Sequence, residues 1–321
     1  MRHRKNPRKT PENQLPDRLI LAHLTDPHLP LARPSLLEAL SKRGLSYANW
    51  LRSRRFLHRL EIAARIVADL KAARPDFIAM TGDLVNFSLE QEFASGADWL
   101  SGLGPSEQVG VIPGNHEAMV RGFEARMMRH WAAYVTSDDG QPGFPWLRRR
   151  RGVALIGLSS AVATPPFMAT GRLGAGQLDA LTRLLAETGR EGLCRVVLVH
   201  HPPTSITRGR KALTDRAALC QVIAAEGAEL VLHGHTHRAD LSSIDTAAGR
   251  VPVIGAPACG MRPGAGHDEG AWRRLEISRD DAGWRLVLQE RRVTATNDVT
   301  DGPQLSFRLP GARLARSAAT P

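Results

Sequence analysis

The sequence predicts an α/β fold, and two observations support that prediction. Short apolar runs of strand length alternate along the chain with segments whose apolar residues recur at a helical period. The runs at residues 19–24, 77–80, 196–199 and 230–232 each lead directly or within a few residues into a polar motif. Strands that alternate with helices favour a sheet covered by helices. In such sheets, ligand-binding side chains gather beyond the carboxyl ends of the strands.

The other elements before residue 250 follow the same alternation. Apolar residues recur on one face of a predicted helix over residues 56–74, which Pro75 ends. The remaining predicted elements are strands at 109–112 and 153–158 and helices at 177–187 and 217–225.

The pattern changes after residue 250. A strand at residues 251–254 leads into a glycine-rich loop at 255–260. Residues 272–277 and 284–293 then read as a β-hairpin with its turn near residues 280–283. A hairpin at this place adds an antiparallel edge, so we expect a mixed sheet.

One domain must hold all the polar motifs, because they extend from residue 26 to residue 237. We predict a basic, disordered arm at residues 1–18, a domain over 19–293 and a loose tail over 294–321. Residues 31–55 form a basic insertion that places leucine and aromatic residues beside arginines. This composition is typical of an interfacial amphipathic segment. A lid or packing insertion over the active site is the alternative.

The net charge of +11 is unevenly distributed. Residues 1–18 carry six Lys or Arg against two acidic residues, and residues 31–60 carry seven against one. Such segments indicate an anionic neighbour, either a membrane surface or nucleic acid, with solvated basic faces as the alternative. The three cysteines lack a CxxC spacing, and there is neither a membrane-spanning run nor a signal peptide. We expect a cytoplasmic protein, with peripheral contact to the inner face of the membrane left open.

Five short motifs contain most of the residues that can bind metal. They offer carboxylate, imidazole and amide groups and no thiolate, which suits divalent Mn, Fe or Zn. Seven such ligands are too many for one ion with an open position, but they suit two ions that share a carboxylate. Such a pair, about 3.5–4 Å apart, stabilises a displacement at phosphorus by a hydroxide held on the metals. The motifs are Asp26-Pro27-His28, Gly82-Asp83, Gly114-Asn115-His116-Glu117, His200-His201-Pro202 and Gly234-His235-Thr236-His237.

The order and chemistry of these motifs resemble the calcineurin-like metallophosphoesterase superfamily, over about residues 19–292. The resemblance implies a four-layer α/β/β/α sandwich with two mixed β-sheets. It implies that Asp83 bridges two metals and that His116 is a catalytic histidine that binds no metal. It also implies that Asp26, His28 and His237 hold one metal, and that Asn115, His200 and His235 hold the other.

Two assignments near the motifs stay open in the sequence. The superfamily pattern favours His200 over His201 as a ligand, although both precede Pro202. As an imidazolium, His116 can donate to a phosphate oxygen or protonate the leaving group. Glu117 is a candidate to orient this imidazole and raise its pKa, with capping of a following helix as the alternative.

Other charged or imidazole side chains carry weaker expectations. Arg208, Arg210 and Lys211 follow the His200 motif and Arg262 follows the glycine-rich loop, so all four are candidates to bind the substrate anion, with a solvated surface position as the alternative. The histidines outside the motifs have no spacing relation to them. We expect each of those histidines, His58 included, to be structural.

One detail favours phosphodiesters over phosphomonoesters. Protein phosphatases of this superfamily usually carry arginine just before the third motif, where it meets a dianionic phosphate. Here that residue is Pro113, as in the branch that acts on cyclic nucleotides and glycerophosphodiesters. We therefore expect a metal-dependent phosphodiesterase that acts on a small substrate of that kind, with a membrane-lipid origin left open. A nuclease of the same superfamily and a non-catalytic binding scaffold are the alternatives.

Overall fold

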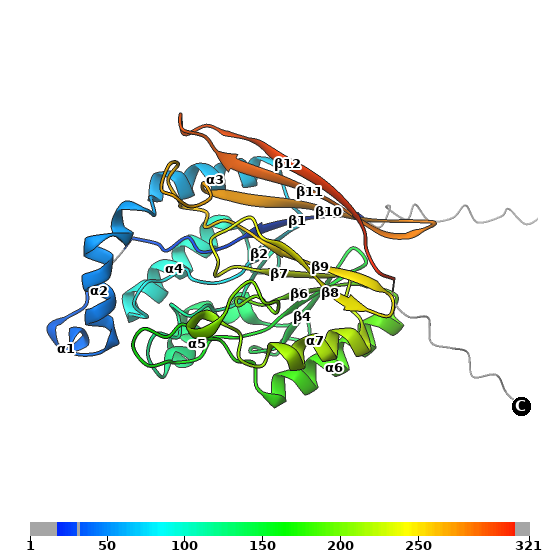
Figure 1. Cartoon of the computed structure of the whole chain (residues 1–321), viewed down its shortest axis with the longest axis horizontal. Coiled ribbons are helices and arrows are strands. Elements are labelled where there is room, and N and C mark those ends of the chain that lie inside the picture. The colour runs from blue at the N-terminus through cyan, green and yellow to red at the C-terminus, as the bar shows by residue number, and fades with distance from the viewer. Residues whose placement is uncertain (1–17, 31–32, 312–321) are drawn as a thin grey trace, which may run out of the picture.

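A computed structural model describes residues 18–30 and 33–311 of the chain, and Figure 1 shows it. Two six-stranded sheets make up its centre. The first has the order β12-β11-β10-β1-β2-β3, and the second has the order β4-β5-β6-β7-β9-β8. In the first sheet the strands are β1 Arg18–Leu24, β2 Phe77–Met80, β3 Val109–Val111, β10 Ala271–Asp280, β11 Gly283–Val293 and β12 Val299–Arg308. In the second they are β4 Trp146–Arg150, β5 Val153–Gly157, β6 Cys194–Leu198, β7 Leu230–His233, β8 Leu241–Thr246 and β9 Gly249–Gly255.

Both sheets are mixed, as the sequence predicts. In the first, β1, β2 and β3 run parallel while β10, β11 and β12 pair antiparallel. In the second, β5, β6, β7 and β9 run parallel, with β4 and β8 as antiparallel edges. The parallel strands of each sheet therefore deliver their carboxyl ends to one side.

Helices cover the outer faces of the two sheets. Among them, α3 lies against β10 and β11, whereas α6 and α7 pack on the second sheet (Figure 1). Together with the two sheets they form the predicted four-layer α/β/β/α sandwich. The helices are α1 Leu36–Ala39, α2 Lys42–Arg52, α3 Leu60–Ala72, α4 Glu90–Leu103, α5 Phe123–Trp131, α6 Ala175–Arg190 and α7 Arg216–Glu226, with short 3-10 turns at Arg54–Phe56 (η1), Ala132–Val135 (η2) and Gly209–Lys211 (η3).

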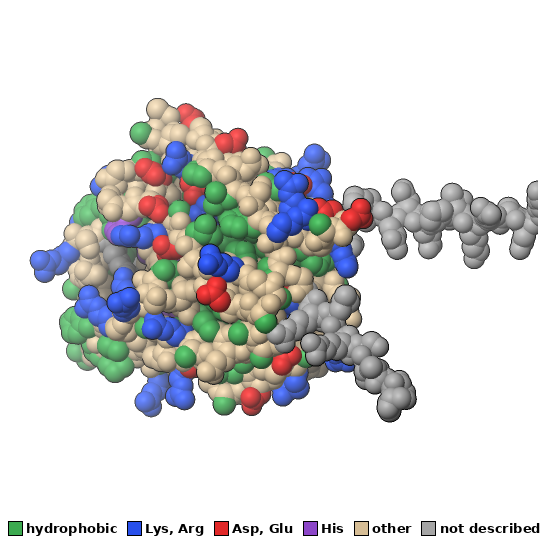
Figure 2. Space-filling model, turned by 45° about the vertical axis from the view of Figure 1, so that its right-hand side comes forward, with side chains coloured by type: hydrophobic (Ala, Val, Ile, Leu, Met, Phe, Trp, Pro, Cys, Tyr) green, Lys and Arg blue, Asp and Glu red, His purple; other side chains and the backbone are tan. Residues whose placement is uncertain are grey.

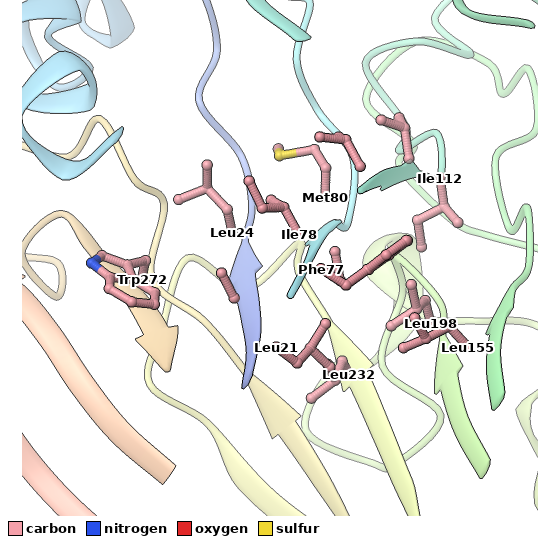
Figure 3. Packing of buried hydrophobic residues seen from close by; sticks show 14 of the residues in the cluster. Leu21, Leu24, Phe77, Ile78, Met80, Ile112, Leu155, Leu198, Leu232 and Trp272 are labelled. Carbon is pink, nitrogen blue, oxygen red and sulfur yellow. The ribbon is translucent and has the colours of Figure 1, made fainter. Parts of the chain in front are cut away.

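The main core lies between the sheets. Leu21 and Phe77 of the first sheet and Leu232 of the second belong to one buried cluster (Figure 3). The indole of Trp146 links the two sheets, because its Nε1 on β4 donates a hydrogen bond to the carbonyl of Val111 on β3 at 2.9 Å. Burial of such large apolar side chains contributes roughly 1.5–3 kcal/mol each. The core thus fixes the strand ends that carry the motifs.

The expectation of a loose tail over residues 294–321 is wrong for its first half. Residues Val299–Arg308 form β12, which pairs antiparallel with β11. Gly302 and Pro303 are uncommon inside strands, so the sequence does not predict this one. Pro303 is tolerated because β12 lies at the sheet edge. The predicted arm falls outside the described residues except for Arg18, which opens β1, and so does the tail beyond residue 311.

The basic insertion folds as a pair of helices. Within the described part of residues 31–55, α1 and α2 project together from one end of the molecule (Figure 1). They approach closely at Gly44, where a Cβ atom would lie 2.0 Å from the carbonyl oxygen of Ala39. Among all the described helices, none is long and apolar enough to cross a bilayer.

Candidate metal centre

The seven expected ligands come together at the carboxyl ends of five strands. Asp26 and His28 follow β1, and Asp83 follows β2. Asn115 follows β3, His200 follows β6, and His235 and His237 follow β7. Because β1, β2 and β3 belong to one sheet and β6 and β7 to the other, the site spans both sheets at their shared end.

Four of these side chains form a compact first group. Asp26, His28, Asp83 and His237 each offer one ligand atom, and these atoms all lie within 4.8 Å of one another. The Nε2 atom of His237 is 3.1 Å from the Oδ1 atom of Asp26 and 3.3 Å from the Nε2 atom of His28. Two carboxylates and two imidazoles at these separations fit a divalent cation.

The other three side chains form a second group that also includes Asp83. The Nε2 atom of His200 lies 3.5 Å from the Oδ2 atom of Asp83 and 3.3 Å from the Oδ1 atom of Asn115. That same amide oxygen is 2.8 Å from the Nδ1 atom of His235. Asp83 therefore belongs to both groups, and its carboxylate is the group that they share.

The geometry favours His200 over His201 as the ligand. The Nδ1 atom of His200 faces the carbonyl of Thr81 at 2.7 Å, which leaves Nε2 directed into the second group. The ring of His201 is held elsewhere, with Nδ1 2.8 Å from the hydroxyl of Ser160 and Nε2 3.2 Å from the carbonyl of Ala169.

Five of the seven side chains extend from backbone in the left-handed region. Their φ angles are positive, which is uncommon for residues other than glycine and tolerated best by Asn, Asp and His. Backbone strain of this kind costs about 1–3 kcal/mol per residue and persists only where the surroundings impose it. The residues are Asp26 (51°), His28 (44°), Asp83 (55°), His235 (69°) and His237 (56°).

Hydrogen bonds between the loops hold this backbone in place. The amides of Asp26 and His28 donate to the carbonyls of Gly82 and Asp83 at 3.0 and 3.1 Å. The amide of His116 donates to the Oδ1 atom of Asp83 at 2.8 Å, and that of His235 donates to the Oδ2 atom of Asp26 at 3.1 Å. The carboxylates are thus fixed by backbone donors as well as by imidazoles.

The motifs require glycine because atoms of neighbouring loops lie very close to its α-carbon. A Cβ atom on Gly114 would lie 2.2 Å from the Oδ1 atom of Asp83, and one on Gly234 would lie 2.6 Å from the Oδ2 atom of Asp26. At Gly82, where φ is +97°, it would lie 2.7 Å from the amide nitrogen of Gly114. Any larger residue would therefore displace a carboxylate or a loop of the site.

The electrostatics of the site keep both carboxylates ionised. Burial alone would raise the pKa of Asp26, but the charges of His237, His200 and His28 lower it well below its usual range. The pKa of Asp83 is also lowered, because His200 and His116 outweigh the effect of burial. In the same way, Asp83 overcomes burial and raises the pKa of His200 to about 9.

The chain matches the calcineurin-like phosphoesterase family model over residues 19–239. It belongs to the calcineurin-like phosphoesterase family. A probable cyclic nucleotide phosphodiesterase of Synechococcus sp. is 29% identical over 230 residues, which cover 70% of this chain and 81% of that protein.

Solved structures show the same fold. A dimetal phosphatase from Danio rerio matches with a TM-score of 0.55 at 12% identity, covering 92% of this chain and 99% of its own. A purple acid phosphatase from yellow lupin matches with a TM-score of 0.55 at 12% identity, covering 91% of this chain and 54% of its own. At such low identity these likenesses concern the fold alone.

In this phosphoesterase, Glu117 does not take the role expected of it. Its two buried carboxylate oxygens accept hydrogen bonds from backbone amides in both neighbouring loops rather than orienting His116. The Nδ1 atom of His116 instead lies 2.8 Å from the carbonyl oxygen of Asn86. The amides bound by Glu117 are those of Asp83 (2.9 Å), Leu84 (2.7 Å), Val85 (3.1 Å) and Gly114 (2.7 Å).

Sequence reasoning missed His58, which the structure places against the phosphoesterase's first ligand group. Its ring centroid lies 4.5 Å from that of His28 and 5.4 Å from that of His237. An antiparallel bridge between His58 and Met261 brings it there. No sequence spacing could reveal a contact that depends on a bridge between residues so far apart.

Two adjoining cavities lie over the ligands. A small one of about 160 Å³ is lined by His58, His237 and other side chains of the site. A larger one of about 380 Å³ shares Asn115 and His116 with it and extends toward the helical insertion. The volumes suit a small substrate whose phosphoryl group lies over the ligand groups.

The four cationic side chains proposed to bind the substrate lie at different places relative to these cavities. Arg262 lines a separate hollow beside Arg59 and Glu61, so the structure does not support a substrate contact for it. Arg208 precedes η3 and is exposed, whereas Arg210 and Lys211, within η3, line the larger cavity. Of the candidates in this loop, Arg210 and Lys211 therefore lie nearer to the cavity than Arg208.

Proposed function

We propose that this chain is a phosphodiesterase that uses two divalent metal ions and acts on a small phosphodiester. The observation that carries the proposal is the pair of ligand groups that meet at Asp83. When bound there, such a pair of cations polarises phosphoryl oxygens and lowers the pKa of a coordinated water. Asp26, His28, Asp83 and His237 would hold one cation, and Asp83, Asn115, His200 and His235 would hold the other.

The protein's own groups account for binding and proton transfer. His116 lines both cavities, and its Nδ1 atom is fixed by the carbonyl of Asn86. The ring's other nitrogen, Nε2, would then be the atom that meets the substrate. From there it can donate a proton to a phosphoryl oxygen or to the departing alkoxide.

The residue before the third motif favours a diester over a monoester, although Arg210 and Lys211 of η3 also line the larger cavity. Pro113, where protein phosphatases place arginine, brings no cation to the site. Lys42 lines the larger cavity, but its ammonium already donates to Thr164 and to the carbonyl of Met168. A monoester dianion brings about one more negative charge than a diester and would benefit from an arginine fork.

The apolar part of the cavity favours a small molecule over a nucleic acid chain. Leu45, Trp50 and Phe167 line it together with the polar residues near His116. A nucleic acid backbone needs a continuous basic track, whereas a nucleobase or an acyl group can lie against apolar and aromatic side chains. The relative described as a probable cyclic nucleotide phosphodiesterase supports the same substrate class.

The test compares matched substrates on the Mn-loaded protein. We expect kcat/KM for a bis-aryl phosphodiester to exceed that for the matched aryl monoester by at least about tenfold, or roughly 1.4 kcal/mol. Cyclic nucleotides and glycerophosphodiesters then identify the branch. A monoester rate at or above the diester rate, on the same metal and at the same pH, would refute the preference. Diester hydrolysis that continues unchanged after complete metal removal would refute the two-metal proposal.

A further inference from the structure

The helical insertion exposes an unusual set of apolar side chains. On α1, Leu36 is 90% exposed, Leu37 82% and Leu40, which ends the helix, 85%. None of the four residues of α1 is buried. Large apolar side chains that gather on a surface indicate a site of interaction rather than a fold requirement.

A second exposed apolar segment is attached to the same place. Phe167 is 76% exposed and lies in the loop whose Thr164 and Met168 accept hydrogen bonds from the ammonium of Lys42 on α2. That ammonium ties the loop to the helical insertion, so the two apolar groups lie on one end of the molecule. Figure 2 shows hydrophobic side chains gathered over α1 with Lys and Arg side chains beside them.

The charge of this end is almost entirely positive. Between residues 33 and 55 there are six Lys or Arg and one acidic residue, Glu38. The carboxylate of Glu38 is engaged with the amide and hydroxyl of Ser35 and lies 3.7 Å from Arg43. Arg52 and Arg55 are exposed, as is Arg210, whose carbonyl accepts a hydrogen bond from the amide of Ala169 next to the Phe167 segment. Leucines that project from a basic surface suit an anionic lipid bilayer, because headgroups attract the cations while the acyl region receives the leucines.

Some apolar residues of the insertion face the domain and do not belong to this exposed surface. Tyr47 and Trp50 of α2 pack against Phe87 and its buried neighbours Leu89 and Met119. The insertion therefore has an inner face that anchors it to the domain and an outer face that is left apolar. The inner face suits the alternative of a packing insertion over the active site, and the outer face leaves room for the interfacial segment that the sequence also allows.

We propose that α1 and the segment around Phe167 form a docking face for an anionic membrane surface. The larger cavity opens on this face, since the exposed Leu45 and Phe167 line it together with His116. A docked enzyme would thus receive the phosphodiester of a lipid headgroup directly from the bilayer. This last step rests on the proposed function, whereas docking itself does not.

The test measures sedimentation of the full chain with vesicles of phosphatidylcholine, with and without phosphatidylglycerol. We expect binding to the anionic vesicles that weakens as salt is raised. Replacing Leu36, Leu37 and Leu40 together with serine should lower the partition coefficient at least about tenfold, because three apolar side chains no longer enter the bilayer. The matched control replaces Leu241 and Leu305, exposed leucines on β8 and β12, and should bind as the native chain does.

Two further measurements separate docking from catalysis and from protein association. Turnover of a soluble diester should be unchanged in the triple variant, while turnover of a vesicle-embedded phosphodiester should fall with binding. Vesicle binding that survives the three substitutions would overturn the docking face. So would a native chain that ignores anionic vesicles and forms a dimer that the triple variant loses, which would assign the face to a second copy. A native chain that binds anionic vesicles but does not turn over a soluble diester would refute the proposed function and leave the docking result standing.

Discussion

Glu117 offers a sharp test of how the ligand loops are held. Its carboxylate joins the loop after β2 to the loop after β3 through four backbone hydrogen bonds. In Glu117→Gln the side-chain shape is kept, but the amide nitrogen can accept neither of the two bonds it faces. Two lost bonds to a charged acceptor, at roughly 1.5–3 kcal/mol each, predict a loss of about 3–6 kcal/mol in the free energy of unfolding.

The assay is urea unfolding of metal-free protein, so that any loss of metal does not enter the result. It should be run at high pH, because burial and the charge of Asp83 raise the pKa of Glu117 to about 7. Metal affinity, measured separately, should also fall, since the amides released belong to Asp83 and to Gly114, which precedes Asn115.

A matched control exists in Glu92, another buried carboxylate that binds a loop. Its oxygens accept hydrogen bonds from the amides of Asn86, Phe87 and Leu89. Unlike Glu117, it does not bind the amides of Asp83 or Gly114. Glu92→Gln should therefore lose stability to a similar extent while keeping metal affinity. If the two variants lower metal affinity equally, or if Glu117→Gln unfolds like the native chain, the coupling of the loops through Glu117 is refuted.

Three other outcomes follow from the site and its surroundings. Asp83→Asn should lower the affinity for both metals by more than the roughly 10–100-fold typical of residues that only support a ligand, as titration with metal ions will show. His116→Ala should keep two metals per chain while kcat falls about 10²–10⁴-fold, and loss of a metal equivalent in elemental analysis would make His116 a ligand. Burial alone would raise the pKa of Asp69, but its hydrogen bonds to Arg291 and Trp272 outweigh this effect and hold the pKa below its usual range. The carboxylate of Asp69 contributes to the free energy of unfolding at neutral pH, and this contribution is lost as the pH falls through the lowered pKa. In Asp69→Asn the free energy of unfolding, measured at a series of acid pH values, should therefore depend less on pH.

The sequence reveals those parts of the site that depend on local chain order. Asp83 could be assigned because the five motifs, in their order, resemble the calcineurin-like metallophosphoesterase superfamily, and because the carboxyl ends of neighbouring strands meet. His58 could not, since its place depends on the bridge to Met261. The partners of Glu117 were missed for a similar reason, because backbone amides leave no mark in a sequence.

The fold shows the same division between local and distant information. The strands with continuous apolar runs, such as β6 and β7, are predicted closely because they are buried on both faces. β12 was missed because an edge strand with a solvated face needs few apolar residues and admits proline.

The left-handed backbone of the ligand residues bears on how any variant of this site should be designed. At Asp26, His28, Asp83, His235 and His237 the side chain would supply a ligand atom to a bound metal, while the residue type also sets how readily φ stays positive. Alanine at these positions removes the donor and adds a conformational cost, so a loss of activity would combine two effects. Asparagine, which tolerates that conformation, leaves the loop as it is and replaces the carboxylate or imidazole by a neutral amide, so it tests the charge or ring of the ligand without the backbone cost. The need for a positive φ would also keep Asp, Asn or His at these five positions in a relative that had lost its metals. Recognising a relative that still binds metal therefore depends equally on Asn115 and His200, which do not have a positive φ.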